Sequence, residues 1–269
     1  MPSMFNARDA GNYEKLMGRW SRRLAPLFIE HAGIANGEEV LEVGCGTGSL
    51  TFALAEATAL KSLTAVDHSE IYLAAAQAKD RGGRIRFEQG DGCSLRFADA
   101  SFDRTVSMLV LPSVLPQPEL MVGEMRRVTR PGGVVAAAFW DSPGGTPSQR
   151  MLWDTAAALD EAAAAARDRT MSRPIYAVGA LTRMWTQSGL IEVDQQSLMI
   201  RMDFTDFADY WEPFASGEGA LGAYVAALDG IQRAKLEGQL RSAYMTGRPD
   251  GERSFVAVAV SCRGVVPSA

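Results

Sequence analysis

The sequence is poor in the residues that most often build metal sites and disulfide frameworks. It holds two histidines and three cysteines among its 269 residues. The cysteines, Cys45, Cys93 and Cys262, are odd in number and have no C-x-x-C spacing, which argues against a disulfide framework and a zinc knuckle. Since no cluster of carboxylates accompanies them, we expect reduced thiols and no metal site.

Long apolar runs are also missing. The longest uninterrupted one covers residues 134–140, far short of the ~18 residues that a membrane-spanning helix needs. Residues 1–15 include Arg8, Asp9 and Glu14 and have no apolar stretch of the kind that marks a secretory signal. We therefore expect a cytoplasmic protein that makes no contact with a membrane.

The charges show no basic excess. Lys and Arg number 27 against 32 Asp and Glu, a net charge of −5. The longest basic blocks are the pairs Arg22-Arg23 and Arg126-Arg127, so the electrostatic footprint of a nucleic-acid-binding protein is absent. A small molecule is the expected partner, and the sequence leaves the oligomeric state open.

Short apolar or β-branched segments alternate with helical stretches through the first half of the chain. The expected strands are residues 39–43, 62–66, 85–88, 104–110 and 134–140, and the expected helices between them are 49–59, 69–79 and 118–129. An amphipathic helix over 13–32 precedes them and ends at Gly33. This alternation predicts an α/β fold with a doubly wound, mostly parallel sheet.

The second half begins with a turn-forming run over residues 142–147. It then predicts an alanine-rich helix over 148–169, a helix over 178–188, a strand over 191–203, an aromatic-containing helical region over 204–244 and a last strand over 254–262. A length of 269 residues suits one large domain. We predict a single domain over 1–269, with helical insertions at about 142–176 and 204–245 that cap a substrate site.

A glycine-rich turn connects the first strand of this sheet to a helix. It contains Gly44, Gly46 and Gly48, and such a turn lets a ligand approach the main chain beside the N–H groups of a helix N-terminus. The dinucleotide fingerprint needs its third glycine one place later, where this chain has Ser49. That departure argues against NAD and FAD, and the lack of a following Gly-Lys-Ser/Thr excludes a P-loop.

Two acidic residues follow the next strands. Asp67 ends the second strand, 19 residues beyond Gly48, a separation at which an acid commonly accepts hydrogen bonds from ribose hydroxyls. Asp91 lies between Gly90 and Gly92 after the third strand, where a carboxylate could accept an exocyclic amine of a base. Because the carboxyl ends of parallel strands meet at one edge, we expect a ribose-containing ligand there.

Taken together, these motifs resemble class I S-adenosylmethionine-dependent methyltransferases, particularly the ubiquinone/menaquinone-biosynthesis-like group (methyltransferase type 11). The resemblance covers residues 39–140 strongly and the rest of the chain in general terms. It rests on Glu42-x-Gly44-x-Gly46-x-Gly48, Val66-Asp67, Gly90-Asp91, Ser101-Phe102-Asp103 and the run from Arg127 to Gly133. It implies a seven-stranded sheet of order 3-2-1-4-5-7-6 with strand 7 antiparallel, and S-adenosylmethionine as cofactor, with S-adenosylhomocysteine as product.

The resemblance also implies roles for individual residues. The main chain of Gly44, Cys45 and Gly46 would approach the methionine portion of the cofactor, and Glu42 would order the turn and contact that end. Asp67 would hold both ribose hydroxyls, and His68 would lie against the adenine face. Asp91 with Gly92 would meet the adenine edge. Ser107 would border the methionine pocket, and Gly48 would permit close helix packing.

No catalytic residue is identified. Cys45 lies within the glycine turn without a histidine positioned by sequence, so it is interpreted as a small filler, and His31 as a partner of a helix C-terminus. Relatives often carry histidine after the fourth strand, whereas this chain has Leu109-Val110-Leu111-Pro112. The acceptor is then nucleophilic by itself, or another residue accepts its proton.

The resulting hypothesis is methyl transfer to a small, apolar or aromatic acceptor by in-line displacement, driven by proximity and orientation. Two alternatives stay open. One is a non-catalytic, nucleoside-binding regulator on the same fold, and the other is a nicotinamide oxidoreductase. The sequence does not identify the acceptor or the atom type that is methylated.

Overall fold

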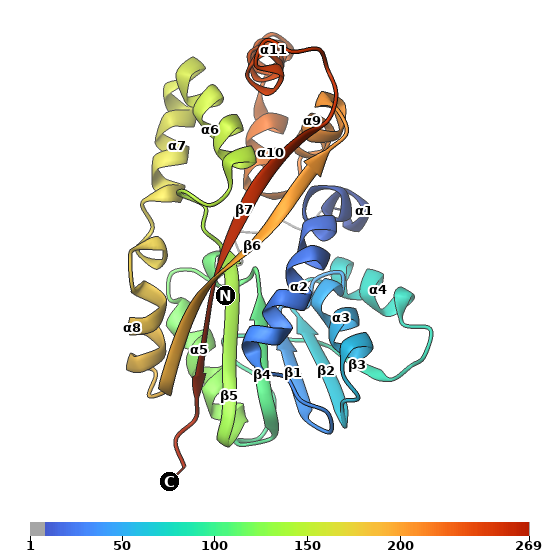
Figure 1. Cartoon of the computed structure of the whole chain (residues 1–269), viewed down its shortest axis with the longest axis vertical. Helices are drawn as coiled ribbons and strands as arrows, with labels where there is room; N and C mark the ends of the chain where they lie inside the picture. The colour runs from blue at the N-terminus through green and yellow to red at the C-terminus, as the bar shows by residue number, and fades with distance from the viewer. Residues whose placement is uncertain (1–8, 269) are drawn as a thin grey trace.

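A single seven-stranded sheet organises the computed structural model, which describes residues 9–268 (Figure 1). Its strands lie in the order β3-β2-β1-β4-β5-β7-β6. Their bounds are β1 (Glu39–Val43), β2 (Ser62–Asp67), β3 (Ile85–Gln89), β4 (Phe102–Met108), β5 (Thr129–Trp140), β6 (Ile191–Phe204) and β7 (Arg253–Val265). The pairs among β1 to β5 are parallel, and β7 runs antiparallel between β5 and β6. The predicted fold class, strand order and antiparallel seventh strand are confirmed.

Helices cover both faces of the sheet. The helical segments are α1 (Ala10–Tyr13), the π-helical η1 (Glu14–Gly18), α2 (Arg19–Ala32), α3 (Ser49–Ala57), α4 (Glu70–Lys79), η2 (Leu111–Ser113), α5 (Pro118–Val128), α6 (Pro147–Leu159), α7 (Glu161–Met171), η3 (Pro174–Tyr176), α8 (Ala180–Gln187), α9 (Phe207–Ala215), α10 (Gly219–Ala227) and α11 (Gly230–Met245). Successive side chains of β1 and β2 point to opposite faces of the sheet. On one face they pack in a hydrophobic core with α2 and α3, and on the other face they pack in a second core with α5 and α8. Buried apolar area on both faces therefore holds the sheet between two helical layers.

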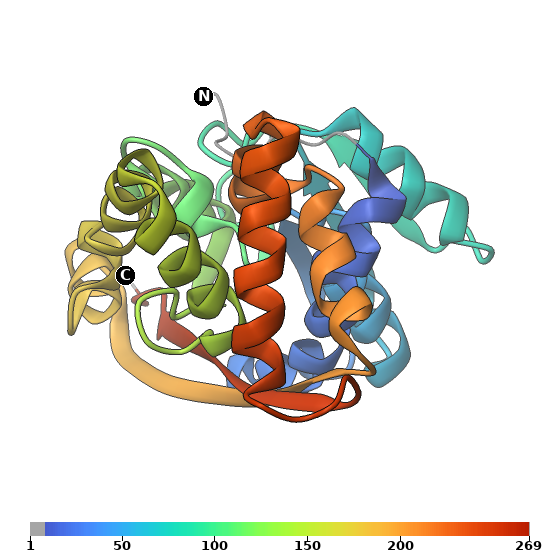
Figure 2. The ribbon, with the colours of Figure 1, turned by 90° about the horizontal axis from the view of Figure 1, so that it is seen from above.

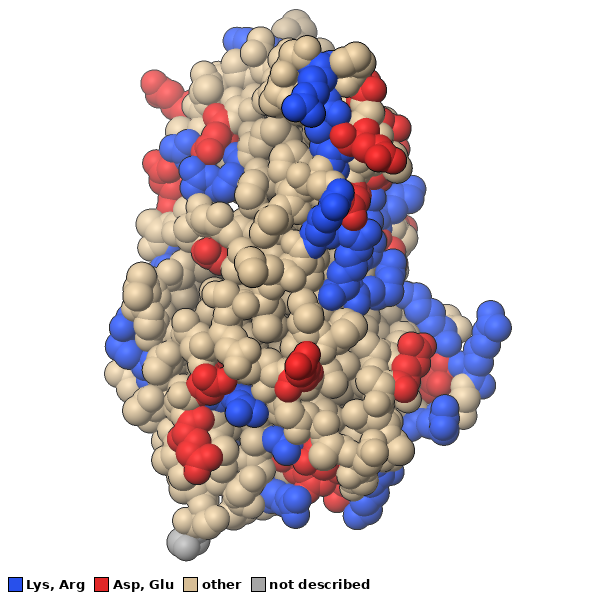
Figure 3. Space-filling model, in the orientation of Figure 1, with Lys and Arg blue, Asp and Glu red and all other residues tan. Residues whose placement is uncertain are grey.

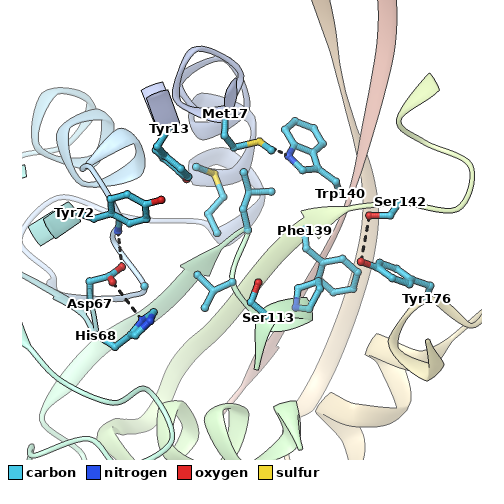
Figure 4. Close-up of a pocket in the computed structure, with 16 residues that line it drawn as sticks. Tyr13, Met17, Asp67, His68, Tyr72, Ser113, Phe139, Trp140, Ser142 and Tyr176 are labelled. Carbon is cyan, nitrogen blue, oxygen red and sulfur yellow. Dashed lines mark hydrogen bonds and ion pairs between the residues drawn. The ribbon is translucent and has the colours of Figure 1, made fainter. Parts of the chain in front are cut away.

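The first helix begins earlier than residue 13. Asp9 caps it by accepting a hydrogen bond from the Asn12 amide at 2.7 Å, and the helix then passes through one π-helical turn before α2. It ends at Gly33 as expected, because Gly33 adopts φ 66° and its amide bonds back to Ile29 and Glu30. The π turn places Tyr13 and Met17 toward the carboxyl edge of the sheet (Figure 4).

The prediction of one continuous helix over 148–169 is wrong. Asp160 has an extended backbone, φ −149°, and its side chain accepts a hydrogen bond from the Ala162 amide at 3.0 Å. A short acidic side chain stabilises a new helix start in this way, so α6 ends and α7 begins at this residue. The helical stretch over 204–244 is likewise three helices, α9 to α11, with Asp229 forming a capping box at the start of α11.

The helices of these two insertions lie together beyond the carboxyl ends of the parallel strands (Figure 1). Seen from above, α11 crosses between α6–α7 on one side and α9 on the other (Figure 2). Buried aromatic side chains of α9 and α11 pack on one another and on Phe204 and Phe255 of the β6–β7 hairpin; they are Phe207, Tyr210, Trp211, Phe214 and Tyr244. The aromatic set from 204 to 224 thus supplies mainly core.

The long hairpin of β6 and β7 leaves one of its faces open. Met199 and Val256 are both exposed, and the face where these strands run carries few charges at its centre (Figure 3). Basic and acidic side chains beside this face form ion pairs with each other, as Arg23 does with Asp203 at 2.7 Å.

Over residues 9–268, no helix combines the length and apolar character needed to cross a bilayer.

A buried carboxyl group connects β1 to α3. The Glu42 side chain is 1% exposed and accepts a hydrogen bond from the Thr51 hydroxyl at 2.5 Å. Burial raises the pKa of Glu42 to about 8, because removing the carboxylate from water outweighs the hydrogen bond from Thr51. The folded protein therefore keeps this carboxyl protonated at neutral pH.

Replacing Trp185 with alanine should destabilise the fold strongly. Trp185 of α8 is fully buried between helix and sheet, and its indole N–H donates to the Val135 carbonyl at 3.1 Å. Loss of this ring should lower the free energy of unfolding by about 3–5 kcal/mol. Urea denaturation measures the change, with Val178→Ala, a 97% exposed position, as the control expected to stay within about 0.5 kcal/mol of wild type. Similar losses in both variants would contradict the packing described.

The buried Glu42 should make stability depend on pH. An unfolded chain ionises this carboxyl near pH 4.5, so between that pH and about 8 the folded protein binds the extra proton. Its contribution to stability is full below pH 4.5 and is lost as the pH rises toward 8, by up to about 1.4 kcal/mol per pH unit.

Glu42→Gln removes this titration. The unfolding free energy of the variant minus that of wild type should therefore increase steadily from pH 4.5 to about 8. Urea titrations of the two proteins across this range supply the difference, in which the other titrating groups cancel. Two parallel pH profiles would show that Glu42 is already ionised in the folded protein.

Candidate functional site

Two adjoining cavities open at the carboxyl edge of β1, β2 and β4. The larger has a volume of about 200 Å³ and the smaller about 60 Å³. Gly44, Asp67, His68, Val110 and Ser113 line both of them. One elongated ligand can therefore extend from one cavity into the other past Asp67.

The glycine turn forms the floor between the cavities. The amides of Gly44 and Cys45 both donate to the Val66 carbonyl, at 2.7 and 3.0 Å. Gly44 has φ 81°, and a Cβ on it would collide with Val110. These hydrogen bonds attach the turn to β2. Because both N–H groups are already used, the turn presents its glycine Cα atoms to the cavities.

Asp67 holds the next residue of the turn. Its Oδ2 accepts a hydrogen bond from the Gly46 amide at 2.7 Å (Figure 4). Its Oδ1 accepts one from the Ser69 amide at 2.8 Å. The side chain of Asp67 is 7% exposed, and that of His68, whose Nδ1 lies 3.5 Å from Oδ1, is 52% exposed. A carboxylate has about four lone-pair positions, so capacity for two hydroxyl donors remains on the side that faces the cavities.

The smaller cavity combines apolar walls with a second carboxylate. Val43, Val66 and Met121 form walls, and Asp91 and Gly92 lie at its border. A Cβ on Gly92 would lie 2.9 Å from Val43 Cγ1 and 3.3 Å from Met121 Sδ, so glycine keeps this cavity open. Asp91 Oδ1 accepts a hydrogen bond from the Cys93 amide at 2.8 Å. The cavity therefore offers flat apolar contact together with a hydrogen-bond acceptor at one edge.

Four residues named from the sequence lie behind the turn and do not line either cavity: Glu42, Cys45, Gly48 and Ser107. The Ser107 hydroxyl donates to the Val43 carbonyl at 2.7 Å. Glu42 is bonded to Thr51, and burial raises the pKa of the Cys45 thiol far above its usual value. A Cβ on Gly48 would collide with the Phe52 ring. Their contacts support the turn from below.

The larger cavity continues away from Asp67 into an apolar region that the sequence motifs did not identify. Met17, Met108, Phe139, Trp140 and Tyr176 line it. The chain leaves β4 at Leu109, which has φ 67°, so the predicted strand over 104–110 ends early and residues 109–113 bend along the cavity. At the top, the Trp140 indole N–H points to Met17 Sδ at 3.1 Å (Figure 4). These side chains come from β4, β5 and two helical segments far apart in the sequence.

Tyr13 and Tyr72 form the wall nearest the N-terminal helix. Their ring centroids lie 4.8 Å apart, and the Tyr13 hydroxyl oxygen approaches Gly46. Burial raises the pKa of both phenols. The Tyr72 hydroxyl donates to Glu218, a fully buried residue just before α10. This bond connects the helices of the second insertion to the α4 side of the site.

Trp20 of the N-terminal helix does not line the cavity. It packs in the core on Phe204, with ring centroids 5.2 Å apart.

The larger cavity carries little charge. Among the side chains that line it, Asp67 is the one carboxylate and His68 the one imidazole, and none is lysine or arginine. Across the described part of the chain, residues 9–268, no group of three or more His, Cys, Asp or Glu side chains is arranged to hold a metal ion. The cavity is thus suited to hydrogen bonding and apolar contact at one end and to apolar contact at the other.

Comparison with known proteins identifies a methyltransferase domain over residues 41–137. Over 132 residues, the chain is 35% identical to the ubiquinone/menaquinone biosynthesis C-methyltransferase UbiE of Bdellovibrio bacteriovorus. That match covers 47% of this chain and 54% of the relative. The chain thus spans about half the length of the curated relatives it matches.

Solved structures share the fold over nearly the whole chain. A Bacillus halodurans protein described as a methyltransferase superposes with a TM-score of 0.60, at 18% identity, covering 91% of this chain and 99% of that one. Phosphoethanolamine N-methyltransferase 2 of Haemonchus contortus, in complex with phosphomonomethylethanolamine and S-adenosylhomocysteine, gives a TM-score of 0.59 at 16% identity, covering 96% of this chain and 57% of that one. At such identities the likeness concerns the fold alone.

The matched domain begins in β1 and ends in β5, so it contains the glycine turn, Asp67, Asp91 and the carboxyl ends of β1, β2 and β4. The relatives, the domain and the strand order agree with one another. Residues 41–137 thus match a methyltransferase domain, and the fold around them is one that solved methyltransferase structures share.

Proposed function

We propose that this protein transfers a methyl group from S-adenosylmethionine to a small, uncharged, apolar or aromatic acceptor. The observation that carries the proposal is the larger cavity. It joins the glycine turn and Asp67 at one end to an aromatic region at the other. The helices within 142–176 and 204–245 act as the cap that encloses this space.

The residues present fit the cofactor. Asp67 retains acceptor capacity for two ribose hydroxyls, and Gly46, whose Cα borders the larger cavity, leaves room for the methionine portion. The smaller cavity has apolar walls for the faces of an adenine ring. The carboxylate of Asp91 at its border can accept a hydrogen bond from the adenine edge, and His68 also lines this cavity. Glu42, Cys45, Gly48 and Ser107 shape the turn from behind. When bound, S-adenosylmethionine supplies an activated methyl group on a sulfonium, so the chemistry is largely its own.

The acceptor is expected to be uncharged because the apolar region has no cation to neutralise an anion. An unpaired charge in such surroundings costs several kcal/mol. The Haemonchus enzyme was solved with a phosphorylated ligand, a type of molecule for which this cavity has no lysine or arginine. A flat ring would contact Phe139 and Trp140 on one side and Met17 on another.

The protein's contribution to rate is alignment. Holding the acceptor in line with the transferred methyl group, at near-contact distance, can lower the barrier by ~7–11 kcal/mol. Residues 109–112, Leu-Val-Leu-Pro, supply no base beside β4. An acceptor that is itself nucleophilic therefore suits the site, and the methylated acceptor would release its proton to solvent water. Leu109 and Val110 line the cavity beside β4 with apolar side chains.

A second candidate keeps the cofactor site without the reaction. The absence of a base among residues 109–112 favours a nucleoside-binding regulator on the same fold. A nicotinamide oxidoreductase has no such support, because residues 41–137 match a methyltransferase domain.

Cofactor binding should depend on Asp67. We expect wild type to bind S-adenosylmethionine and S-adenosylhomocysteine and to leave NADH unbound, as measured by calorimetric titration. Asp67→Asn should lower the affinity for S-adenosylmethionine and for S-adenosylhomocysteine by at least about tenfold, since hydrogen bonds to a charged group contribute about 1.5–3 kcal/mol each. The control is Asp168→Asn, an exposed carboxylate on α7, which should bind as wild type does. Unchanged affinity in Asp67→Asn would remove the assigned ribose contact.

Methyl transfer should favour uncharged acceptors. Incubation with S-adenosylmethionine labelled in its methyl group and a panel of quinols, phenols, aromatic amines and thiols should give labelled product. The carboxylated counterpart of each acceptor should react at least tenfold more slowly, because its charge has no partner in the cavity. Tight cofactor binding with no transfer to any acceptor would favour the regulator, and transfer only to carboxylated acceptors would contradict the proposed cavity chemistry.

A further inference from the structure

Two hydroxyl groups lie at the end of the larger cavity opposite Asp67. The Ser142 hydroxyl donates to the Tyr176 hydroxyl oxygen at 3.2 Å, and both residues line the cavity (Figure 4). They face a region otherwise built from Met17, Phe139 and Trp140. This hydroxyl pair is therefore the polar feature at the acceptor end of the site.

The position of the hydroxyl pair is fixed by neighbouring structure. Ser142 lies two residues beyond Trp140, the last residue of β5, and the amide of the intervening Asp141 donates to the Val258 carbonyl at 2.9 Å. Tyr176 ends η3, and its ring packs edge-on against Phe139 with centroids 5.8 Å apart. A rigid strand and a packed ring thus hold two residues that are 34 positions apart in the chain.

The hydrogen bond leaves one proton unused. Because Ser142 donates to the oxygen of Tyr176, the phenolic proton of Tyr176 is available, and it has no acceptor among the side chains and carbonyls of residues 9–268. Burial raises the pKa of Tyr176 above its usual value, so the proton stays in place at neutral pH. Tyr176 is half-buried and lines the larger cavity, so a ligand there that offers an oxygen can accept this proton.

We propose that Tyr176, oriented by Ser142, donates a hydrogen bond to an uncharged oxygen of the methyl acceptor and so determines which acceptors bind and which of their atoms faces the cofactor. This inference rests on the proposed function. An oxygen held at Tyr176 fixes one end of the acceptor, and the cavity walls fix the plane of its ring. The atom presented toward Asp67 and the glycine turn then depends on its position relative to that oxygen.

The hydrogen bond can be tested through binding, without turnover. Three probes share one ring system and differ at a single position: 2-naphthol has a hydroxyl group, 2-methylnaphthalene a methyl group and 2-naphthoate a carboxylate. Their dissociation constants are measured by ligand-detected NMR on wild type, Tyr176→Phe and Ser142→Ala, with and without S-adenosylhomocysteine. Tyr224→Phe is the matched control, because its hydroxyl lies on the cap outside the cavity, 3.3 Å from Asp160.

The expected result is a selective loss. Tyr176→Phe should weaken 2-naphthol at least fivefold and leave 2-methylnaphthalene within a factor of two, whereas a general disturbance of the cavity would weaken both equally. Ser142→Ala should weaken 2-naphthol less, since it orients Tyr176 without contacting the probe. Tyr224→Phe should match wild type, and 2-naphthoate should bind at least tenfold more weakly than 2-naphthol.

Equal losses of 2-naphthol and 2-methylnaphthalene in Tyr176→Phe, or no binding of either probe to wild type, would overturn the inference. The proposed function fails separately, if the protein binds no S-adenosylmethionine or transfers no methyl group. Cofactor binding combined with an unselective Tyr176→Phe result would leave methyl transfer standing and remove only the role of Tyr176.

Discussion

Three consecutive amides of the glycine turn are held by the last two residues of β2. Gly44 and Cys45 donate to the carbonyl of Val66, and Gly46 donates to the carboxylate of Asp67. The shape of the turn and the position of the acidic side chain are therefore one arrangement. Parallel pairing of β1 with β2 in a register that places Val43 opposite Val66 brings these groups together. A register shift of one residue would separate them and turn every side chain of the strand to the other face.

The rest of the site is placed relative to this turn by longer connections. The β6–β7 hairpin extends past the sheet, and the helices α9 to α11 between its strands reach back over the strand ends (Figure 1). Glu218, from this insertion, is bonded to Tyr72 of α4, 146 positions away in the chain. The other insertion contributes Tyr176. Residues of the N-terminal helical segment, the strand ends and the first insertion line the larger cavity together, so tertiary packing alone forms it.

The glycine turn depends on neighbouring residues of the sequence, whereas the rest of the site depends on distant ones, and this difference explains how much could be predicted from the sequence. Glycine turns and the acids that follow buried strands are local patterns, so the candidate residues from Gly44 to Gly92 could be named before any coordinates. The sheet order, by contrast, was implied by the family resemblance and not by these patterns. The break at Asp160 depends on a single capping side chain within an alanine-rich stretch that otherwise favours helix. Trp140 and Tyr176 carry no motif. Their place in the cavity follows from a strand end and a helical turn that meet only in the folded protein.

The two ends of the larger cavity differ in the charge that they can accommodate. At one end lie the Asp67 carboxylate, which the Gly46 and Ser69 amides hold in place, and the half-exposed His68. Around Phe139 and Trp140 the only polar side chains are neutral. In the proposed reaction, the single positive charge of the sulfonium is spread over donor and acceptor in the transition state, and the methylated acceptor then loses a proton. Fixed contacts at both ends of the cavity would supply the alignment that such a transfer needs.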